Sequence, residues 1–344
     1  YIKLKDINEI NLQFAKISFI QLNLFKHLDT LKLINLRSNK LKEIPDGVFK
    51  GLVNLENILL SDNYIKVLNS NVFKGLNKIK TIDLASNRIE SLPDGIFKGH
   101  FNLENILLDI NQIKQLNSKV FNGLGQLKKI RFSSNKIQSL PYEIFKDLIN
   151  LKDICLHKNE IKELDSNVFQ GLNELKTIDL AVNKLNSLPN GLFRHLNNLE
   201  TICLDANEIQ ILNLNDFKGL SNLKTIDLSR NKIKKISVGT FQELKNLEIL
   251  HLSNNELKAI DSNLAPVQST RPTNLYLPGS VFMGVYSCAV LLISQFPVFS
   301  LKNCHSKLSN KSVFAASKVT FGIQLPKVAT VVLKVISGAD GKPE

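Results

Sequence analysis

A thiol and an imidazole stand two residues apart in this chain of 344 residues, at Cys155 and His157. Such a pair could form an activated nucleophile if the imidazole accepted the thiol proton. Together with Cys203 it could also offer ligands to a zinc ion. Both chemistries need further groups that converge on one point, so the outcome depends on the elements that carry these residues.

Those elements repeat every 24 residues, as from Asn39 to Asn63. The sequence Leu-x-x-Leu-x-Leu-x-x-Asn-x-Leu, as in residues 31–41, recurs without insertion or deletion, and a phenylalanine keeps the same interval. A constant period of this length indicates a solenoid. The asparagines, called the ladder asparagines below, are Asn39, Asn63, Asn87, Asn111, Asn135, Asn159, Asn183, Asn207, Asn231 and Asn255. The phenylalanines are Phe25, Phe49, Phe73, Phe97, Phe121, Phe145, Phe169, Phe193, Phe217 and Phe241.

This pattern resembles the leucine-rich repeat family, in the 24-residue extracellular form of Toll-like and Slit-like ectodomains, over roughly the first three quarters of the chain. The resemblance implies an α/β solenoid. A curved parallel β-sheet would form the concave face, and irregular or short helical segments would form the convex side. It also implies an extracellular or cell-surface protein that recognises a macromolecular partner, in innate immunity or adhesion.

The two repeated residues have separate structural roles in such a solenoid. Each ladder asparagine is predicted to bury its amide and to pair with backbone groups that a tight turn leaves open. The phenylalanines are predicted to stack as a second buried row on the convex side, where removing one ring costs about 3–5 kcal/mol. The second half of the repeat alternates between two forms, Leu-Pro-x-x-x-Phe and Leu-Asn/Asp-Ser-x-Val-Phe, so the full sequence period covers two repeats.

The repeat also divides the chain into three parts. Residues 1–30 read as a degenerate first unit, because Ala15 stands where the asparagine belongs. Residues 31–264 hold ten leucine-rich repeats. Residues 265–344 form a non-repeat tail, since Ala265 replaces the next phenylalanine and prolines follow it.

The tail contains the apolar segment 281–301, which is long enough to cross a bilayer as a helix. Lysines follow this segment, which favours a carboxyl end on the inner side of the membrane and repeats on the outer side. Two other interpretations stay open: a buried β-rich cap, and an aberrant end of the sequence. The predicted location is extracellular or at the cell surface, with a single membrane pass as an option, while a cytoplasmic location also stays open.

The variable strand positions form rows across the predicted concave face. One row reads Lys32, Glu56, Lys80, Glu104, Lys128, Lys152, Lys176, Glu200, Lys224 and Glu248. Opposite charges on neighbouring strands stabilise a sheet by about 0.2–1 kcal/mol per pair. The alternation fails between Lys128 and Lys176, where further cations lie nearby.

This interruption predicts a docking site for an acidic protein surface. Its cationic residues are Lys128, Lys129, Arg131, Lys152, His157, Lys158 and Lys176. A second row reads Asn35, Leu59, Asp83, Leu107, Arg131, Cys155, Asp179, Cys203, Asp227 and His251, and we expect Asp83, Asp179 and Asp227 to contact a partner. The variety of this row suits protein recognition better than one small ligand.

Catalysis, metal binding and a cofactor are not expected. Cys155 and Cys203 occupy the same position two repeats apart, about 9–10 Å from each other at the usual strand spacing, which is too far for a disulfide. The same distance separates them as metal ligands. His27, His100 and His195 lie beside the phenylalanine loops and are predicted to be surface or half-buried structural residues. The formal charge of +13 is spread over a mixed surface, so nucleic acid is not an expected partner.

The predicted function is a protein-recognition module that binds a macromolecular partner on its concave face, as a cell-surface or secreted receptor or adhesion-type protein. The alternative is a soluble scaffold or inhibitor protein, with the tail as a folded β-rich cap. The fate of segment 281–301 separates the two.

Overall fold

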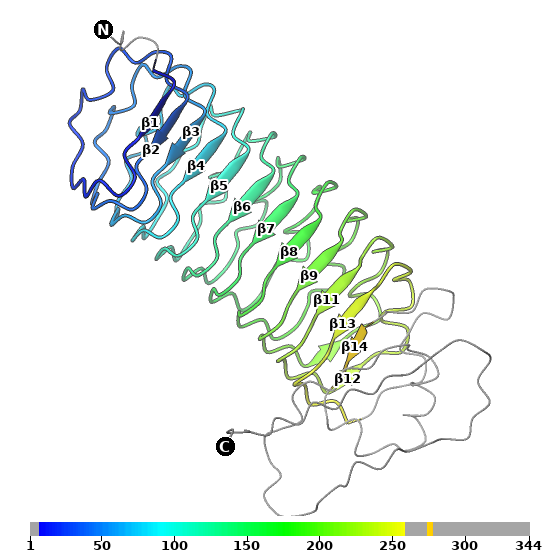
Figure 1. The fold of residues 1–344 in the computed structure, drawn as a ribbon. Coiled ribbons are helices and arrows are strands. Elements are labelled where there is room, and N and C mark those ends of the chain that lie inside the picture. Colours follow the sequence, from blue (N-terminus) through cyan, green and yellow to red (C-terminus); the bar gives the residue numbers. More distant parts are fainter. Residues whose placement is uncertain (1–6, 259–273, 278–344) are drawn as a thin grey trace, which may run out of the picture.

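A computed structural model of the chain describes residues 7–258 and 274–277. In these ranges twelve short parallel strands follow one another in chain order and form one continuous sheet (Figure 1). Their bounds are β1 Glu9–Asn11, β2 Leu33–Asn35, β3 Asn57–Leu59, β4 Thr81–Asp83, β5 Asn105–Leu107, β6 Lys129–Arg131, β7 Asp153–Cys155, β8 Thr177–Asp179, β9 Thr201–Cys203, β11 Thr225–Asp227, β13 Ile249–His251 and β14 Asn274–Tyr276.

The register of the sheet follows the sequence repeat. Ile34 of β2 lies opposite Ile58 of β3, and Ile58 lies opposite Ile82 of β4, so each strand pairs with the equivalent residue of the next repeat. In this sheet the central residue of each strand from β2 to β13 is buried, while its two neighbours face outward on the concave side. Parallel strands in constant register therefore place each repeat position in a straight row across the sheet.

The convex side consists of irregular turns, with no helix in residues 7–258. A second small sheet pairs β10 Ile211–Leu212 with β12 Lys235–Ile236. The two sequence forms of the repeat make two kinds of turn. In the proline form a glycine such as Gly47 adopts a left-handed φ of 76°. In the other form an Asn or Asp side chain accepts a hydrogen bond from the N–H two residues on, as Asn69 does from Asn71 at 3.0 Å.

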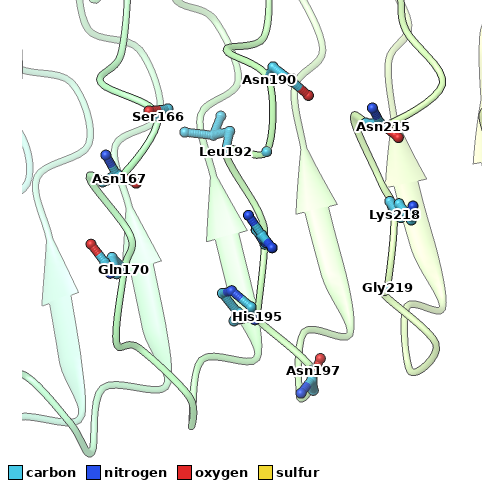
Figure 2. A pocket seen from close by; sticks show the side chains of 12 residues that line it. Ser166, Asn167, Gln170, Asn190, Leu192, His195, Asn197, Asn215, Lys218 and Gly219 are labelled. Carbon is cyan, nitrogen blue, oxygen red and sulfur yellow. The ribbon is translucent and has the colours of Figure 1, made fainter.

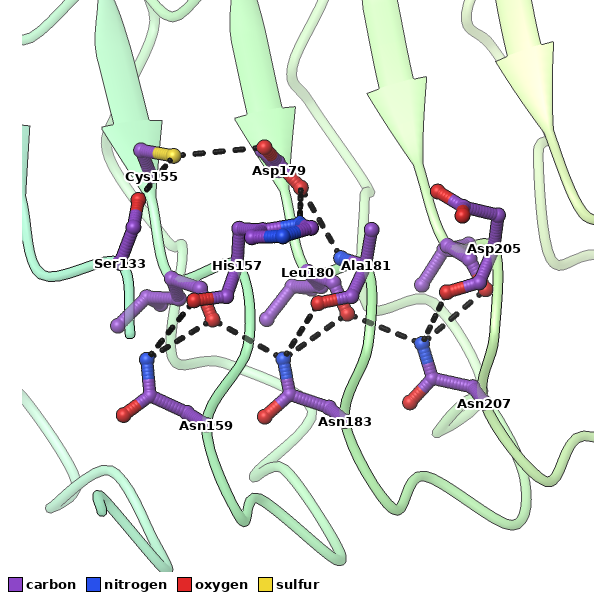
Figure 3. Close-up of polar contacts among 12 residues, drawn as sticks. Ser133, Cys155, His157, Asn159, Asp179, Leu180, Ala181, Asn183, Asp205 and Asn207 are labelled. Atoms are coloured by element: carbon purple, nitrogen blue, oxygen red, sulfur yellow. Dashed lines mark hydrogen bonds and ion pairs between the residues drawn. The ribbon is translucent and has the colours of Figure 1, made fainter. Parts of the chain in front are cut away.

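The ladder asparagines join neighbouring turns, as predicted. Asn63 donates from Nδ2 to the carbonyls of Leu36 and Leu60 at 3.0 and 3.1 Å, and its Oδ1 accepts from the N–H of Leu41 at 3.0 Å. Figure 3 shows the amide nitrogens of Asn159, Asn183 and Asn207 donating to carbonyls in the same way. The acceptor bond recurs at all ten ladder positions.

A second set of asparagines, which the sequence pattern did not reveal, lies just before the strands. Each of its members donates to a carbonyl of the preceding turn, as Asn54 does to Asp29 at 2.7 Å. The others are Asn102, Asn150, Asn198, Asn222 and Asn246. Each of these turns is therefore hydrogen-bonded to its neighbour at both ends of the strand.

The phenylalanine row is also confirmed. All ten rings are buried, and eight of the nine consecutive pairs stack with ring centroids 5.6–6.4 Å apart. Near Phe73 and Phe97 stands His100, at a position that is leucine in the other repeats. His100 is buried rather than at the surface or half-buried, which corrects the prediction. Its Nε2 donates to the carbonyl of Phe73 at 2.8 Å, and its Nδ1 has no hydrogen-bond partner.

The sheet extends into the segment predicted to be the tail. Leu250 of β13 lies opposite Leu275 of β14, a step longer than the one that separates the preceding strands, and Leu275 and Leu277 are buried. The candidate span 281–301, together with Cys288 and Cys304, lies outside the described residues. Within the described ranges no helix has the length and apolar character needed to cross a membrane.

Candidate functional site

The Lys/Glu row runs across the concave face and is stabilised by ion pairs between neighbouring strands. Lys80 pairs with Glu56 at 2.8 Å and Lys128 with Glu104 at 2.9 Å. Glu200 bridges two lysines, Lys176 at 3.0 Å and Lys224 at 2.7 Å. The hydrogen bonds from Lys224 and then Lys176 lower the pKa of the Glu200 carboxyl. The predicted alternation of charges is thus realised as contacts.

Three arginines on the concave face are each held by an aspartate from another turn. Arg37 contacts Asp83 at 2.6 Å, Arg131 contacts Asp109 at 2.8 Å, and Arg230 pairs with Asp205. In every pair the carboxylate is the more buried partner, with side-chain exposures of 4%, 17% and 14% against 37%, 45% and 60% for the arginines. The guanidinium groups are therefore presented to solvent from fixed positions.

The predicted cationic patch is largely paired within the sheet. Lys129 lies 3.7 Å from Asp153, and Lys128, Arg131 and Lys176 have the partners given above. In the part of the chain that the structure describes, Lys152 and Lys158 take part in no ion pair, and both are exposed. Lys158 directly precedes a ladder asparagine and has a left-handed φ of 55°.

The three predicted aspartates differ in what they offer a partner. Asp83 is buried beneath Arg37, so the arginine and not the carboxylate faces outward at this point. Asp179 and Asp227 each use Oδ1 to accept from the N–H two residues further on, in Ala181 and Ser229. The second oxygen of Asp179, Oδ2, accepts from the Cys155 thiol at 3.3 Å, so this carboxylate is already engaged within the sheet.

The thiols of Cys155 and Cys203 are free, as predicted, and neither is activated. Figure 3 shows Cys155 between Ser133 and Asp179, with Sγ 2.9 Å from the serine hydroxyl and 3.3 Å from Oδ2 of the carboxylate. His157 turns its Nδ1 towards Asp179, at 3.9 Å. Burial raises the pKa of the Cys155 thiol, and burial followed by the charges of Asp179, Asp227 and Asp205 raises the pKa of Cys203 to about 12. A nucleophilic thiolate needs the opposite shift.

A groove on the convex side was not anticipated from the sequence. It encloses about 670 Å³ between three successive turns, and Figure 2 shows polar side chains entering it from each of them. Its lining residues are Ser166, Asn167, Gln170, Asn190, Gly191, Leu192, Arg194, His195, Asn197, Asn215, Lys218 and Gly219. They include no carboxylate. The lining residues occupy equivalent positions in successive repeats, so aligning the convex positions of the repeats would have grouped them.

Comparison with known families accounts for the repeats. A family described as "Leucine rich repeat" matches residues 5–65, 29–89, 54–100 and 221–265, and a "BspA type Leucine rich repeat region (6 copies)" matches residues 90–213. The chain is a leucine-rich repeat protein. No curated protein sequence matches this leucine-rich repeat protein.

Solved structures with the same solenoid include a leucine-rich repeat protein of Leptospira interrogans, at 27% identity and a TM-score of 0.70, covering 80% of this chain and 74% of that one. TLR13, in its complex with ssRNA13, has 28% identity and a TM-score of 0.63 over 76% of this chain and 42% of its own. Drosophila Toll, in its complex with Spatzle, has 28% identity and a TM-score of 0.59 over 70% and 35%. This leucine-rich repeat protein thus spans less than half of either receptor chain.

Proposed function

We propose that this leucine-rich repeat protein binds a protein partner on its concave face. The observation that carries the proposal is the set of three arginines, Arg37, Arg131 and Arg230, each fixed by a more buried aspartate. A side chain held in place before binding loses little conformational entropy when a partner arrives. Arginine is also among the residues that contribute most to protein interfaces. The complex of Toll with Spatzle supports a protein partner.

The partner surface at the centre of the face is proposed to be acidic. Lys152 and Lys158 are exposed cations without ion pairs in the described ranges, and Arg131 stands on the adjacent strand. A carboxylate from a partner would satisfy these groups without breaking an existing pair. Arg37 and Arg230 would provide contacts towards the two ends of the face.

The setting proposed for this activity is secreted or at the cell surface, as a receptor or adhesion-type protein. The structural likeness to Toll and TLR13 supports that setting. The alternative of a soluble scaffold or inhibitor uses the same concave face, so the binding test below applies to both.

Site-specific photo-crosslinking from intact cells and their medium tests the concave face. A photoreactive amino acid at Thr177, which faces outward on β8, is expected to give discrete protein adducts. The same group at Ser187, an exposed residue on the convex side of that repeat, serves as the matched control. Equal adducts from both positions would contradict binding by the concave face.

Charge reversal then tests the acidic partner. The double variant Lys152→Glu/Lys158→Glu should lose the Thr177 adducts by more than tenfold, because like charges across an interface are repulsive. Lys42→Glu/Lys162→Glu changes two exposed lysines outside the strands by the same charge and should leave the adducts unchanged. If neither double variant affects the adducts, the partner does not use this patch.

A further inference from the structure

The convex side carries a row of cations that have no role in the binding proposed for the concave face. Each cation is exposed and directly follows one of the buried, regularly spaced phenylalanines. These residues, called the convex basic row below, are Lys26, Lys50, Lys74, Lys98, Lys146, Arg194 and Lys218. The same turn holds each of them, through a hydrogen bond from its N–H to the carbonyl three residues earlier.

The spacing of the row follows from the phenylalanines beneath it. Their ring centroids are 6.0 Å apart between Phe25 and Phe49 and 6.4 Å apart between Phe49 and Phe73. Lys26, Lys50 and Lys74 are thus anchored about as far apart as these rings, within the ~8 Å over which charges interact at physiological ionic strength. Lys26, Lys50, Lys74 and Lys98 occupy four successive turns without interruption. Four like charges in such a row repel one another unless a counter-charge lies along them.

That counter-charge is not supplied by the part of the chain described. On the concave face neighbouring lysines and glutamates neutralise each other, but in the convex basic row Lys146 alone forms an ion pair, with Glu143 at 3.0 Å. Asp46 and Asp94 lie on the turns of Lys50 and Lys98, and neither forms an ion pair with them in the described ranges.

At the far end the row enters the convex groove. Arg194 and Lys218 line it together with His195, and the other polar lining groups are amides and a hydroxyl. Amides donate and accept hydrogen bonds, as sugar hydroxyls do, while cations match negatively charged substituents. The lining therefore combines the two kinds of contact that an acidic sugar requires (Figure 2).

We propose that the convex basic row and its groove bind a linear sulfated polysaccharide. Such a polymer places charge at short intervals along an extended chain, as the row does. A single-stranded nucleic acid would instead need aromatic side chains on which successive bases stack. Phe101 and Tyr142 are exposed on separate turns of this side and do not provide that succession.

The test measures binding of a fluorescent heparin decasaccharide to the full chain by anisotropy, over a series of salt concentrations. Lys50→Gln/Lys74→Gln/Lys98→Gln is expected to weaken binding by at least tenfold at 0.15 M salt. The slope of log Kd against log salt should fall by about two to three, roughly one for each cation that the variant removes from the complex. Arg194→Gln/Lys218→Gln should weaken binding in the same direction.

The matched control is Lys42→Gln/Lys114→Gln/Lys162→Gln, which removes three exposed lysines without ion pairs in the described ranges from another row of the same solenoid. It should bind within twofold of the unchanged chain. Equal weakening in both triple variants would overturn the proposal in favour of general charge attraction. Tighter binding of a ten-nucleotide thymidine strand than of the decasaccharide would overturn the saccharide assignment. No variant should unfold at a lower temperature than the parent chain, because the substituted side chains are exposed and form no ion pair in the described ranges.

Discussion

Among the residues that the structure describes, one carboxyl lies within the buried part of the convex side. Asp216 stands directly before Phe217, at a position that is Val, Ile or Leu in most repeats, and it is buried. Its Oδ2 accepts from the N–H of Asn213 at 2.7 Å, and its Oδ1 has no hydrogen-bond partner. Burial raises the pKa of Asp216, and the hydrogen bond from Asn213 opposes this in part.

Replacing this residue should stabilise the protein in a pH-dependent manner. Because the pKa of Asp216 is higher in the folded chain, the folded state holds the proton more tightly, and stability falls as pH rises above the ordinary aspartate range. Asp216→Val should therefore be about 1–3 kcal/mol more stable than the parent at pH 7, with a smaller gain below pH ~4. Urea unfolding at both pH values checks this, and a gain independent of pH would contradict it.

The sequence predicted individual side-chain contacts less completely than it predicted the fold. The Lys/Glu ion pairs join residues at the same repeat position, so the rows predicted them. The rows did not predict the ion pairs of Arg131 with Asp109 and of Arg37 with Asp83. These pairs join different repeat positions, because an arginine is long enough to reach diagonally across the sheet. Burial of His100 escaped notice for a related reason, since its type suggests a surface residue while its position is a core leucine.

At the scale of the element, the proline-form turn depends on a glycine. Gly47, Gly95 and Gly191 occupy it with φ between 72° and 76°, and Glu143 occupies it in the remaining repeat of this form with φ 62°. A residue with a side chain in this left-handed region is strained by about 1–2 kcal/mol. The sequence showed the exchange of glycine for glutamate, and the backbone angle shows why it matters.

Glu143→Gly should consequently stabilise the protein by about 0.5–1 kcal/mol, since relief of strain exceeds the loss of the exposed ion pair with Lys146. The reverse change at the equivalent site, Gly95→Glu, should destabilise it by about 1 kcal/mol or more. A side chain at Gly95 has room, with Lys98 Cβ 3.8 Å away, so the effect isolates the backbone. Thermal unfolding of both variants decides the matter, and shifts of the same sign would refute the account.

For the whole molecule, the sequence was sufficient to predict the parallel solenoid, its inner asparagines and its outer phenylalanines. Each turn contacts the next through the same positions, so the repeat period determines the contacts. The added strand β14 escaped this reasoning because its register does not keep that period. The convex groove was not predicted, because the space between turns depends on where a residue without a side chain, such as Gly191, leaves room.

Each turn contacts only its neighbours, so a destabilising substitution in an end turn should unfold that end alone. The same substitution in a middle turn should destabilise the turns on both sides of it. Phe25→Ala should increase amide hydrogen exchange mainly in residues 9–35. Phe145→Ala removes a ring stacked on both sides, so it should cost about 3–5 kcal/mol and increase exchange in turns on both sides of it. Exchange followed by mass spectrometry distinguishes the two, and a uniform response to Phe25→Ala would argue for all-or-none unfolding.

The direction of the strands also determines how the molecule responds to mechanical force. The strands lie across the long axis of the solenoid (Figure 1). A pull on its two ends therefore loads the hydrogen bonds between strands one turn at a time, as in opening a zipper, rather than shearing a whole sheet at once. Each turn released adds one repeat, or about 80 Å of extended chain at ~3.3–3.6 Å per residue. A protein built in this way is expected to yield in small steps at low force when it is pulled at its two ends.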